Sequence, residues 1–244
     1  MKKEFPEVKV IGERAVLVEF EPEISEKLLE KILFYKKSIE EYYIKVNVEV
    51  INTYNSLLIY YISNIENIYN EVLAIEQLLS TPNITKKVNS ILFHIPVCYD
   101  FEFGLDLEYL ASQKECSVEE VIVLHTRPVY TVYFIGFLPG FLYLGGLDKK
   151  LHTSRKEQPR MKVEKGAVGI GENQTGIYPK SSPGGWQIIG NSPVDFFDRN
   201  IQPPCEIFAG DKVKFYSISR KRFDEIKDEI NSGNFQIKKE NYEG

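Results

Sequence analysis

The sequence predicts an α+β fold in two parts, a small α/β domain followed by an all-β domain, and three observations lead to it. The first half alternates strand-like and helix-like segments in a regular order. The second half is dense in glycine and proline between short β-like runs, which is typical of a barrel or sandwich. The 244 residues, 43% of them hydrophobic, are enough to bury a core in one or two domains.

The first half is expected to follow the order β-α-β-β-α-β. Leu28 and Ile32 belong to a helical apolar stripe, whereas Val46, Val48 and Val50 alternate with polar residues as in a strand. The predicted elements are a strand at 8–20 with an early bend, a helix at about 22–43, strands at 46–50 and 56–62, a helix at about 64–80, and a strand at 88–97. This order is the split βαβ pattern of ferredoxin-like domains.

The second half is expected to begin with two short helices and to continue as a barrel. Ser117 followed by Glu120 is a capping box, which predicts the start of the second of these helices. The predicted elements are a helix at 106–113, the capped helix to about 125–128, strands at 130–134, 167–170, 186–189, 194–197 and 212–216, and a terminal helix at 220–230. A boundary near 83–89 divides the chain into domains at 1–85 and 86–244.

Composition excludes several classes of partner. A net charge of −5 and a pI near 5.5 argue against a nucleic-acid partner. Three cysteines, an odd number, give no disulfide framework and suit a reducing cytoplasm, and no signal peptide is visible. The uncharged stretch 129–147 contains Pro139 and four glycines, so we predict a buried strand and a tight loop rather than a membrane helix.

Common cofactor motifs are missing. There is no P-loop, and the nucleotide-like run 166–171 has Gln174 where a later glycine is required. His94 and Cys98 are four residues apart, but on a strand they would lie roughly 13 Å from each other and cannot share one ion. We therefore expect neither a metal nor an organic cofactor bound to motifs of this chain.

Polar and aromatic residues gather in the loop-rich half, between residues 125 and 193. Loops that carry aromatic, arginine and amide groups are typical of pockets for polar ligands, although any one of these residues taken singly is better explained by packing or capping. The residues of this group are His125, Tyr130, Tyr133, Arg155, Arg160, Gln174, Tyr178, Ser182 and Trp186.

At these residues the chain resembles a known family, that of the B-type subunits of 5-oxoprolinase, also called the KipI or allophanate hydrolase subunit 1 family. The resemblance is closest over residues 95–198 and extends over nearly the whole chain. The matching motifs are IPVCYD, HTRPVYTVYFIGFLPGFLYLGGL, SRKEQPR, QTGIYP, SPGGWQIIG and AGDKVKF, with GERAVLVEF and NSLLIYY in the first half. Their length and order make chance an unsatisfactory explanation.

The resemblance implies a small α/β N-terminal domain and a cyclophilin-like β-barrel. It also implies a protein that is inactive alone and that works with two partners, a KipA-type (C-type) subunit and an A-type subunit. Together these would form an ATP-dependent 5-oxoprolinase, a hydrolase that opens the cyclic amide 5-oxo-L-proline to L-glutamate, with ATP bound at the level of the complex. Other family roles remain open: an inhibitor of a sporulation sensor histidine kinase, or a subunit of a urea or allophanate pathway enzyme.

Roles for the candidates follow from side-chain type and from matching position in the family. His125 is expected to transfer protons because its reference pKa lies near neutrality. Arg155 and Arg160 are expected to pair with a phosphate or carboxylate. The expected substrate-binding residues are Tyr133, Gln174, Tyr178, Ser182, Gly184 and Trp186. The chain departs from the family at Asn191, where an arginine is common, and at Glu172, where a small residue is common; these two differences concern the binding of an anion and not the fold.

Overall fold

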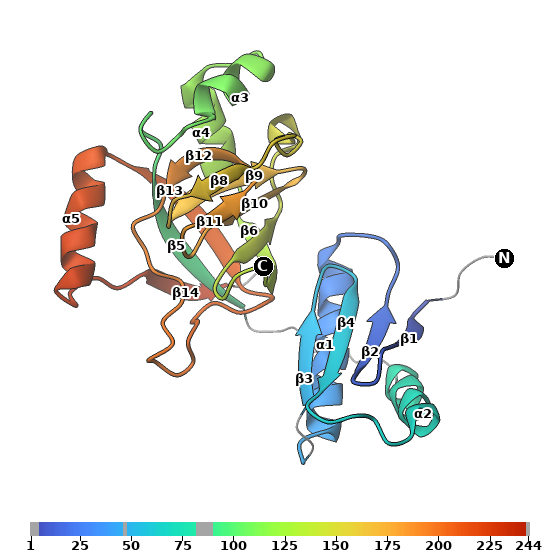
Figure 1. Cartoon of the computed structure of the whole chain (residues 1–244). Helices are drawn as coiled ribbons and strands as arrows, with labels where there is room; N and C mark the ends of the chain where they lie inside the picture. The colour runs from blue at the N-terminus through green and yellow to red at the C-terminus, as the bar shows by residue number, and fades with distance from the viewer. Residues whose placement is uncertain (1–4, 46–47, 82–89, 243–244) are drawn as a thin grey trace. The chain divides into compact units, whose positions relative to one another are not determined.

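The structure, a computed structural model, describes residues 5–45, 48–81 and 90–242 (Figure 1). The chain divides into two compact units, residues 1–88 and residues 89–244, and each is described by itself. The predicted domain boundary near residues 83–89 lies outside the described residues, as do Val46 and the first two residues of the predicted strand at 88–97.

The first unit is a four-stranded antiparallel sheet with two helices on one face. Its elements are β1 (Glu7–Ile11), β2 (Ala15–Glu19), α1 (Glu26–Tyr42), β3 (Val48–Asn52), β4 (Ser56–Tyr61) and α2 (Ile68–Leu79). The strand order is β1-β2-β4-β3. Ser25 caps α1 by accepting a hydrogen bond from the Leu28 N–H at 3.2 Å, and Leu28, Ile32 and Ile39 turn one helix face into the core. The predicted α/β character of this half is confirmed.

The edge of this sheet differs from the predicted order. The segment predicted as one strand at 8–20 is a hairpin, because Gly12 adopts a positive φ of 64° and the chain turns back so that Ile11 pairs with Ala15. The predicted strand at 88–97 is β5 (Ser90–Cys98), which pairs in the second unit. Strand β1 therefore holds the sheet edge beside β2 that a final strand would take in the ferredoxin-like pattern.

The second unit is a closed barrel, as predicted. Its strands are β5, β6 (Tyr130–Ile135), β7 (Leu142–Gly145), β9 (Ala167–Gly171), β10 (Gln174–Ile177), β12 (Gln187–Asn191) and β13 (Lys212–Ile218). The order β12-β9-β10-β7-β6-β13-β5 returns to its start through one pair, Asn191 with Cys98. Strand β14 (Lys238–Tyr242) extends the sheet beside β5, and β8 (Arg160–Val163) with β11 (Ser182–Gly184) forms a separate ribbon.

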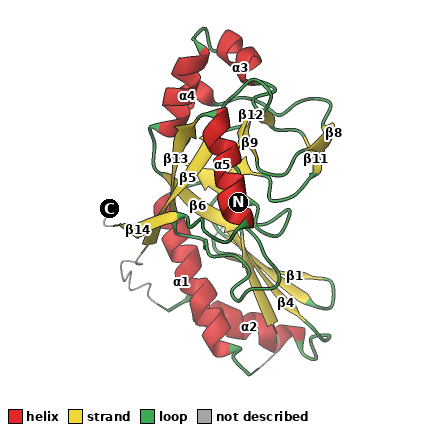
Figure 2. Ribbon diagram, turned by 90° about the vertical axis from the view of Figure 1, so that its left-hand side faces the viewer, coloured by secondary structure: helices red, strands yellow, loops and turns green. Residues whose placement is uncertain are grey.

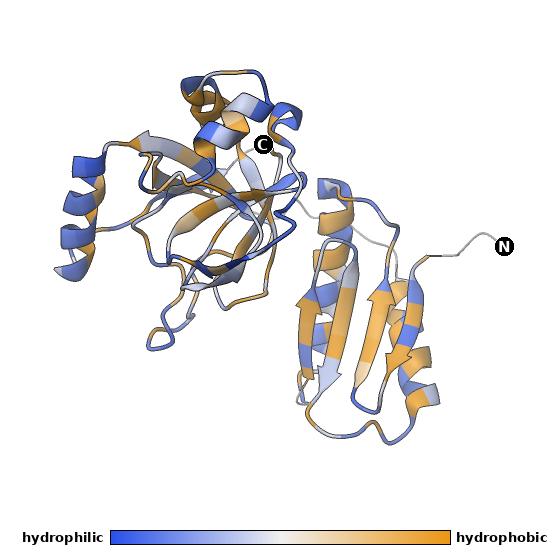
Figure 3. Cartoon of the chain, turned by 45° about the horizontal axis from the view of Figure 1, so that its top comes forward, coloured by the Kyte–Doolittle hydropathy of each residue, from blue (hydrophilic) through white to orange (hydrophobic). Residues whose placement is uncertain are grey.

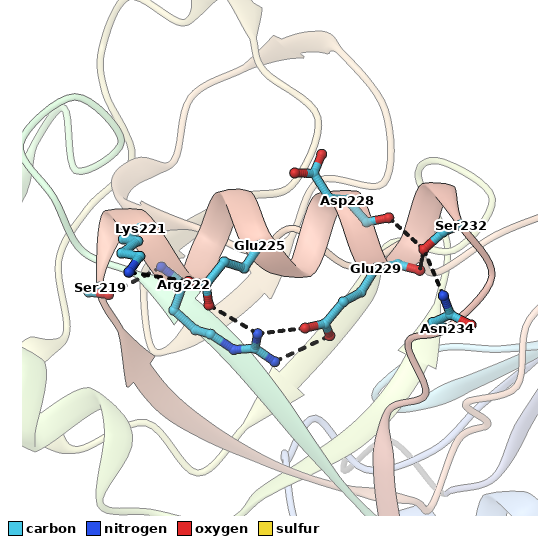
Figure 4. Close-up of polar contacts among 8 residues, drawn as sticks. All are labelled: Ser219, Lys221, Arg222, Glu225, Asp228, Glu229, Ser232 and Asn234. Atoms are coloured by element: carbon cyan, nitrogen blue, oxygen red, sulfur yellow. Dashed lines mark hydrogen bonds and ion pairs between the residues drawn. The ribbon is translucent and has the colours of Figure 1, made fainter.

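Helices flank the barrel at α3 (Leu107–Gln113), α4 (Val118–Thr126), the 3₁₀ turn η1 (Lys149–Leu151) and α5 (Arg220–Asn231) (Figure 2). The predicted cap of α4 is present, since the Ser117 hydroxyl accepts from the Glu120 N–H at 3.1 Å. Helix α5 has a hydrophilic and a hydrophobic side (Figure 3). Arg222 forms ion pairs with Glu225 and Glu229 along this helix (Figure 4). Phe223, on its hydrophobic side, lies in the protein interior.

Two sequence predictions for this unit can be compared directly with the structure. Residues 194–197 were expected to form a strand, and that prediction is wrong: Val194 and Phe196 are buried, but the segment pairs with no strand of the described sheets. The alternation of apolar residues in this segment reflects which side chains are buried, and not pairing with a neighbouring strand. The uncharged stretch 129–147 forms β6, a turn and β7, and none of the described helices is long and apolar enough to cross a membrane.

Candidate functional site

The single tryptophan of the chain lies against the outer wall of the barrel. Val168 and Ile170 point into the barrel core, so the alternate residues of β9 face outward. A Cβ atom on Gly171 would lie 2.5 Å from the indole Nε1 of Trp186, and one on Gly176 would lie 3.0 Å from its Cζ3. Only glycine leaves room for the ring at these positions, and Trp186 is 4% exposed.

Aromatic rings and one cation surround this indole. Phe141 and Tyr143 meet it edge to face, with ring centroids 5.4 and 5.9 Å away. The guanidinium carbon of Arg155 lies 5.8 Å from the indole centroid, within range of a cation–π contact. Arg155 is exposed, and no carboxylate of the described residues lies within ion-pair distance of it. Its charge is therefore available to an anion from solution.

Two further candidates lie on the same outer wall. Gln174 pairs with Gly171 across the β9–β10 hairpin, so its side chain shares the face on which Trp186 lies. Its Oε1 is buried and has no hydrogen-bond partner among the described residues. The ring of Tyr133 packs onto Gly145, where a Cβ atom would overlap it. Gln174 thus adds an unused acceptor to the wall.

A buried carboxylate anchors the loop that carries the cations. Asp106, 4% exposed, accepts at Oδ1 from Arg160 Nη2 at 2.7 Å and from Lys156 Nζ at 3.1 Å. Its Oδ2 accepts from the Ile188 N–H at 2.7 Å. Burial alone would raise the pKa of Asp106, but the hydrogen bonds from Arg160, Ile188 and Lys156 outweigh burial and hold that pKa below its usual value. The Nη1 of Arg160 is buried without a partner among the described residues.

Tyr178 connects the tryptophan to both arginines. Tyr178 packs in the same cluster as Trp186, and a Cβ atom on Gly184 would lie 2.4 Å from its phenol oxygen. Burial raises the pKa of Tyr178, while the positive charges of Arg155 and Arg160 oppose that rise. The fold therefore groups five of the predicted residues, which we call the tryptophan site: Arg155, Arg160, Gln174, Tyr178 and Trp186.

Ser182 and His125 lie apart from the tryptophan site. Ser182 is on the β8–β11 ribbon opposite Val163, and its hydroxyl donates to the Pro183 carbonyl at 3.2 Å. No described contact joins it to Trp186. His125 is on α4, with no exposed surface, and its ring stacks on Phe215 at 4.7 Å.

Both ring nitrogens of His125 are occupied. The Thr175 hydroxyl donates to the Gly169 carbonyl at 3.0 Å, so the same oxygen accepts from His125 Nε2–H at 2.9 Å. His125 Nδ1 then accepts from the Tyr99 hydroxyl at 2.7 Å. Burial lowers the pKa of His125 to about 3, which keeps the ring neutral. This geometry does not fit the predicted proton transfer to a substrate, because the ring has neither a free nitrogen nor access to solvent.

Two clefts lie elsewhere on the second unit. One of about 490 Å³ adjoins α5 and the segment 191–195, and one of about 370 Å³ lies between residues 194–207 and 235–239. Neither is lined by any of the nine predicted site residues. Among the described residues no group of three or more His, Cys, Asp or Glu side chains is placed to hold a metal.

Sequence reasoning missed two residues of this arrangement. Asp106 was read only as the start of a helix, and Lys156 was quoted only as part of the motif SRKEQPR. Lysine and arginine at 155, 156 and 160 gave a signal for a buried counter-charge, but the sequence does not say which carboxylate supplies it. Residues 106 and 160 lie 54 positions apart, and only the fold joins them.

Comparison with known proteins places the chain in a broader context. Residues 6–207 match the family described as "Carboxyltransferase domain, subdomain C and D". The B-type 5-oxoprolinase subunit of Bacillus subtilis is 37% identical over 240 residues, covering 92% of this chain and 98% of that protein. The B-type 5-oxoprolinase subunit of Haemophilus influenzae is 53% identical over 121 residues, covering 50% of this chain and 57% of that protein.

A solved structure shows the same fold. The urea carboxylase of Kluyveromyces lactis superposes with a TM-score of 0.80 over 96% of this chain and 24% of that protein, at 21% identity. At that identity the likeness concerns the fold alone.

Proposed function

The chain belongs to the carboxyltransferase family of subdomains C and D, and from this premise we propose that it is the B-type subunit of an ATP-dependent 5-oxoprolinase. The relatives named as B-type 5-oxoprolinase subunits support the role, since one of them matches along nearly its whole length. A lettered subunit name implies partner subunits, which we expect to be of the A and C types. The free state of Cys98, Cys116 and Cys205 suits a cytoplasmic complex.

The reaction needs help because a lactam is a poor electrophile. Transfer of the ATP γ-phosphoryl group to the lactam oxygen, with release of ADP, creates a leaving group. Water then adds to the ring carbon, and the C–N bond breaks to give a free amine and an acyl phosphate. A second water hydrolyses the acyl phosphate to glutamate and phosphate. A protein site for this substrate needs a cation for the carboxylate, polar groups for the ring amide, and donors for the developing negative charge.

The exposed Arg155 guanidinium above Trp186, with no carboxylate partner among the described residues, is the observation that carries the proposal. We assign Arg155 to the carboxylate of 5-oxoproline, by charge-assisted pairing. The unused Oε1 of Gln174 suits the lactam N–H, and the unpaired Nη1 of Arg160 suits a phosphoryl or carbonyl oxygen. Tyr178 and Gly184 shape the wall beside them, and Tyr133 closes the face at Gly145. His125 we assign to packing of the barrel core.

The test is reconstitution. The chain and its A-type and C-type partners are purified separately and mixed, and ATP-dependent release of glutamate from 5-oxo-L-proline is measured. We expect activity only in the full mixture, and at least a tenfold loss in catalytic efficiency with Arg155→Ala. A stable complex of all three subunits without glutamate release would contradict the proposal.

A second candidate is a subunit of a urea or allophanate pathway enzyme, which the sequence likeness to a urea amidolyase of Saccharomyces cerevisiae, 29% identical over 144 residues, favours. The same mixture supplied with urea or allophanate in place of 5-oxoproline separates the two. The third role, inhibition of a sensor histidine kinase, needs a protein-docking surface and no catalytic group. An autophosphorylation assay with the purified chain tests it.

A further inference from the structure

Asp106 turns its carboxylate away from the helix that it begins. It is the N-cap residue of α3, a position where an aspartate side chain normally accepts from free backbone N–H groups of the first turn. Here the side chain makes no cap hydrogen bond. Its oxygens accept instead from Ile188 on β12 and from Lys156 and Arg160. Helix α3 therefore has no side-chain cap, and the carboxylate instead binds residues beside the tryptophan site.

The segment 154–160, which we call the cation loop, is fixed to the barrel on both sides of Arg155. Before it, Gln187 Nε2 donates to the Ser154 carbonyl at 3.1 Å. After it, the Lys156 backbone N–H donates to the Gly185 carbonyl at 2.7 Å. The side chains of Lys156 and Arg160 then end on Asp106. Arg155 is therefore held in place through its neighbours, while its own charge has no carboxylate partner in the described ranges.

We infer that Asp106 is a positioning residue, which holds the cation loop over Trp186 so that Arg155 is in place before a carboxylate ligand arrives. Binding is tighter when the loop needs no ordering at the moment of association. The inference rests on the proposed function only for the identity of the ligand. The coverage of Trp186 by the loop can be measured without any ligand.

A second buried aspartate provides a matched control. Asp211 is 8% exposed and accepts from the Ile91 N–H at 3.0 Å and the Phe208 N–H at 2.8 Å. It resembles Asp106 in burial and in accepting backbone N–H groups, but it makes no described contact with the cation loop. Substitution of either residue removes a buried negative charge, but only Asp106 contacts the cation loop.

The first experiment compares Asp106→Asn with Asp211→Asn in the whole chain. Trp186 is the only tryptophan, so acrylamide quenching of tryptophan fluorescence reports on that ring alone. We expect the quenching constant to rise at least about twofold in Asp106→Asn, because a loop that has lost its anchor opens locally, and to stay at the wild-type value in Asp211→Asn. Wild-type quenching in a folded Asp106→Asn variant, judged by circular dichroism, would overturn the inference.

Should Asp106→Asn fail to fold, Lys156→Met decides the question. The Lys156 side chain is about one-third exposed, and its loss leaves the pair of Arg160 with Asp106 intact. A smaller rise in quenching supports the inference, and wild-type quenching overturns it.

A kinetic readout in the reconstituted complex separates positioning from chemistry. With 5-oxo-L-proline as the probe, Asp106→Asn should raise KM about tenfold and leave kcat within about twofold, because it weakens placement of a binding cation. A fall in kcat at unchanged KM would overturn the inference. A wild-type complex that does not turn over 5-oxo-L-proline contradicts the proposed function instead, and the quenching comparison then decides the role of Asp106.

Discussion

The inner and outer faces of the β9–β10 hairpin differ in whether the polar groups beside them have hydrogen-bond partners. On the inner face, His125 bonds to both Thr175 and Tyr99, and Thr175 donates to the Gly169 carbonyl, so every donor of the three side chains finds an acceptor. On the outer face, within the described part of the chain, Gln174 Oε1 is buried without a hydrogen-bond partner and Arg155 has no carboxylate partner. A buried polar network that satisfies itself stabilises a core, whereas polar groups left without partners are available to a ligand.

The difference shows why residue type alone does not assign a role. Histidine is the side chain most readily associated with proton transfer, yet here it is the one with no surface and no free nitrogen. The arginine that looks like an ordinary exposed charge stands over an indole that only glycines accommodate. We expect inner-face substitutions to change stability and outer-face substitutions to change binding.

The largest effect is expected from His125→Ala. It leaves a cavity beside Phe215 and deprives the Tyr99 hydroxyl of its acceptor, so the free energy of unfolding should fall by about 4 kcal/mol. Urea denaturation measures it. His94, half-buried and bonded to Glu240 at 2.7 Å, is the control, and His94→Ala should lower the free energy of unfolding by less than about 1 kcal/mol. Equal losses in the free energy of unfolding of the two variants would contradict a stabilising role specific to His125.

Acid should act through the same ring. The pKa of His125 is about 3 in the folded chain and about 6.5 when unfolded, so below pH 6.5 the unfolded chain binds a proton that the folded chain does not. Stability from this group is therefore complete above about pH 6.5 and falls by about 1.4 kcal/mol per pH unit toward the folded pKa. Between pH 6.5 and 4.5 the free energy of unfolding should therefore fall by about 2 kcal/mol. Chemical denaturation of wild type and His125→Gln across this range isolates it, and parallel pH curves would disprove it.

An outer-face substitution with a steric effect should come next. Gly171→Ala places a methyl group against the Trp186 ring, so we expect a loss of about 2 kcal/mol in stability and a shift in tryptophan emission. The control is Gly185→Ala, whose new Cβ would lie 3.6 Å from the Lys156 carbonyl, an ordinary contact. Emission unchanged in Gly171→Ala would mean that the ring does not lie on this wall.

The smallest effect on stability is expected from Arg155→Ala. The side chain is exposed, so the free energy of unfolding should change by less than about 0.5 kcal/mol, while binding of 5-oxo-L-proline weakens by about 1.4 kcal/mol, or tenfold. Isothermal titration with the reconstituted complex measures the affinity. Arg127, exposed and paired with Asp148 at 3.1 Å, is the control, and Arg127→Ala should bind as wild type does. Equal affinity in the two variants would exclude Arg155 from the site.

Much of the fold could be predicted because its signals are local. Ser25 and Ser117 mark helix starts through contacts three residues away, and the sequence shows both. The hairpin at Gly12 was missed because a bend and a reversal need the same residue, and pairing between strands decides which occurs. The glycines of β9 and β10 could be read as barrel corners, since the ring that fills the space above them comes from residue 186.

The candidate site could be predicted in its residue types but not in its grouping. The motifs of the second half named Arg155, Arg160, Tyr178 and Trp186, which the fold brings together. They gave no measure of burial, so His125 carried the same weight as Arg155. Asp106 was missed because an aspartate at a helix start has a sufficient local explanation, and its partners come from distant strands.

The barrel is joined along its seam by a single residue pair, Asn191 with Cys98, whereas β13 and β5 share seven. Gly190 allows this approach, since a Cβ there would lie 2.8 Å from the Cys98 carbonyl oxygen. The barrel wall is therefore expected to open most easily between β12 and β5. Separation of β12 from β5 would break few hydrogen bonds and would leave the pairing of β12 with β9, and of β9, β10 and β7, intact. We therefore expect β12, with Gln187 and Ile188, to move together when the barrel opens at this seam.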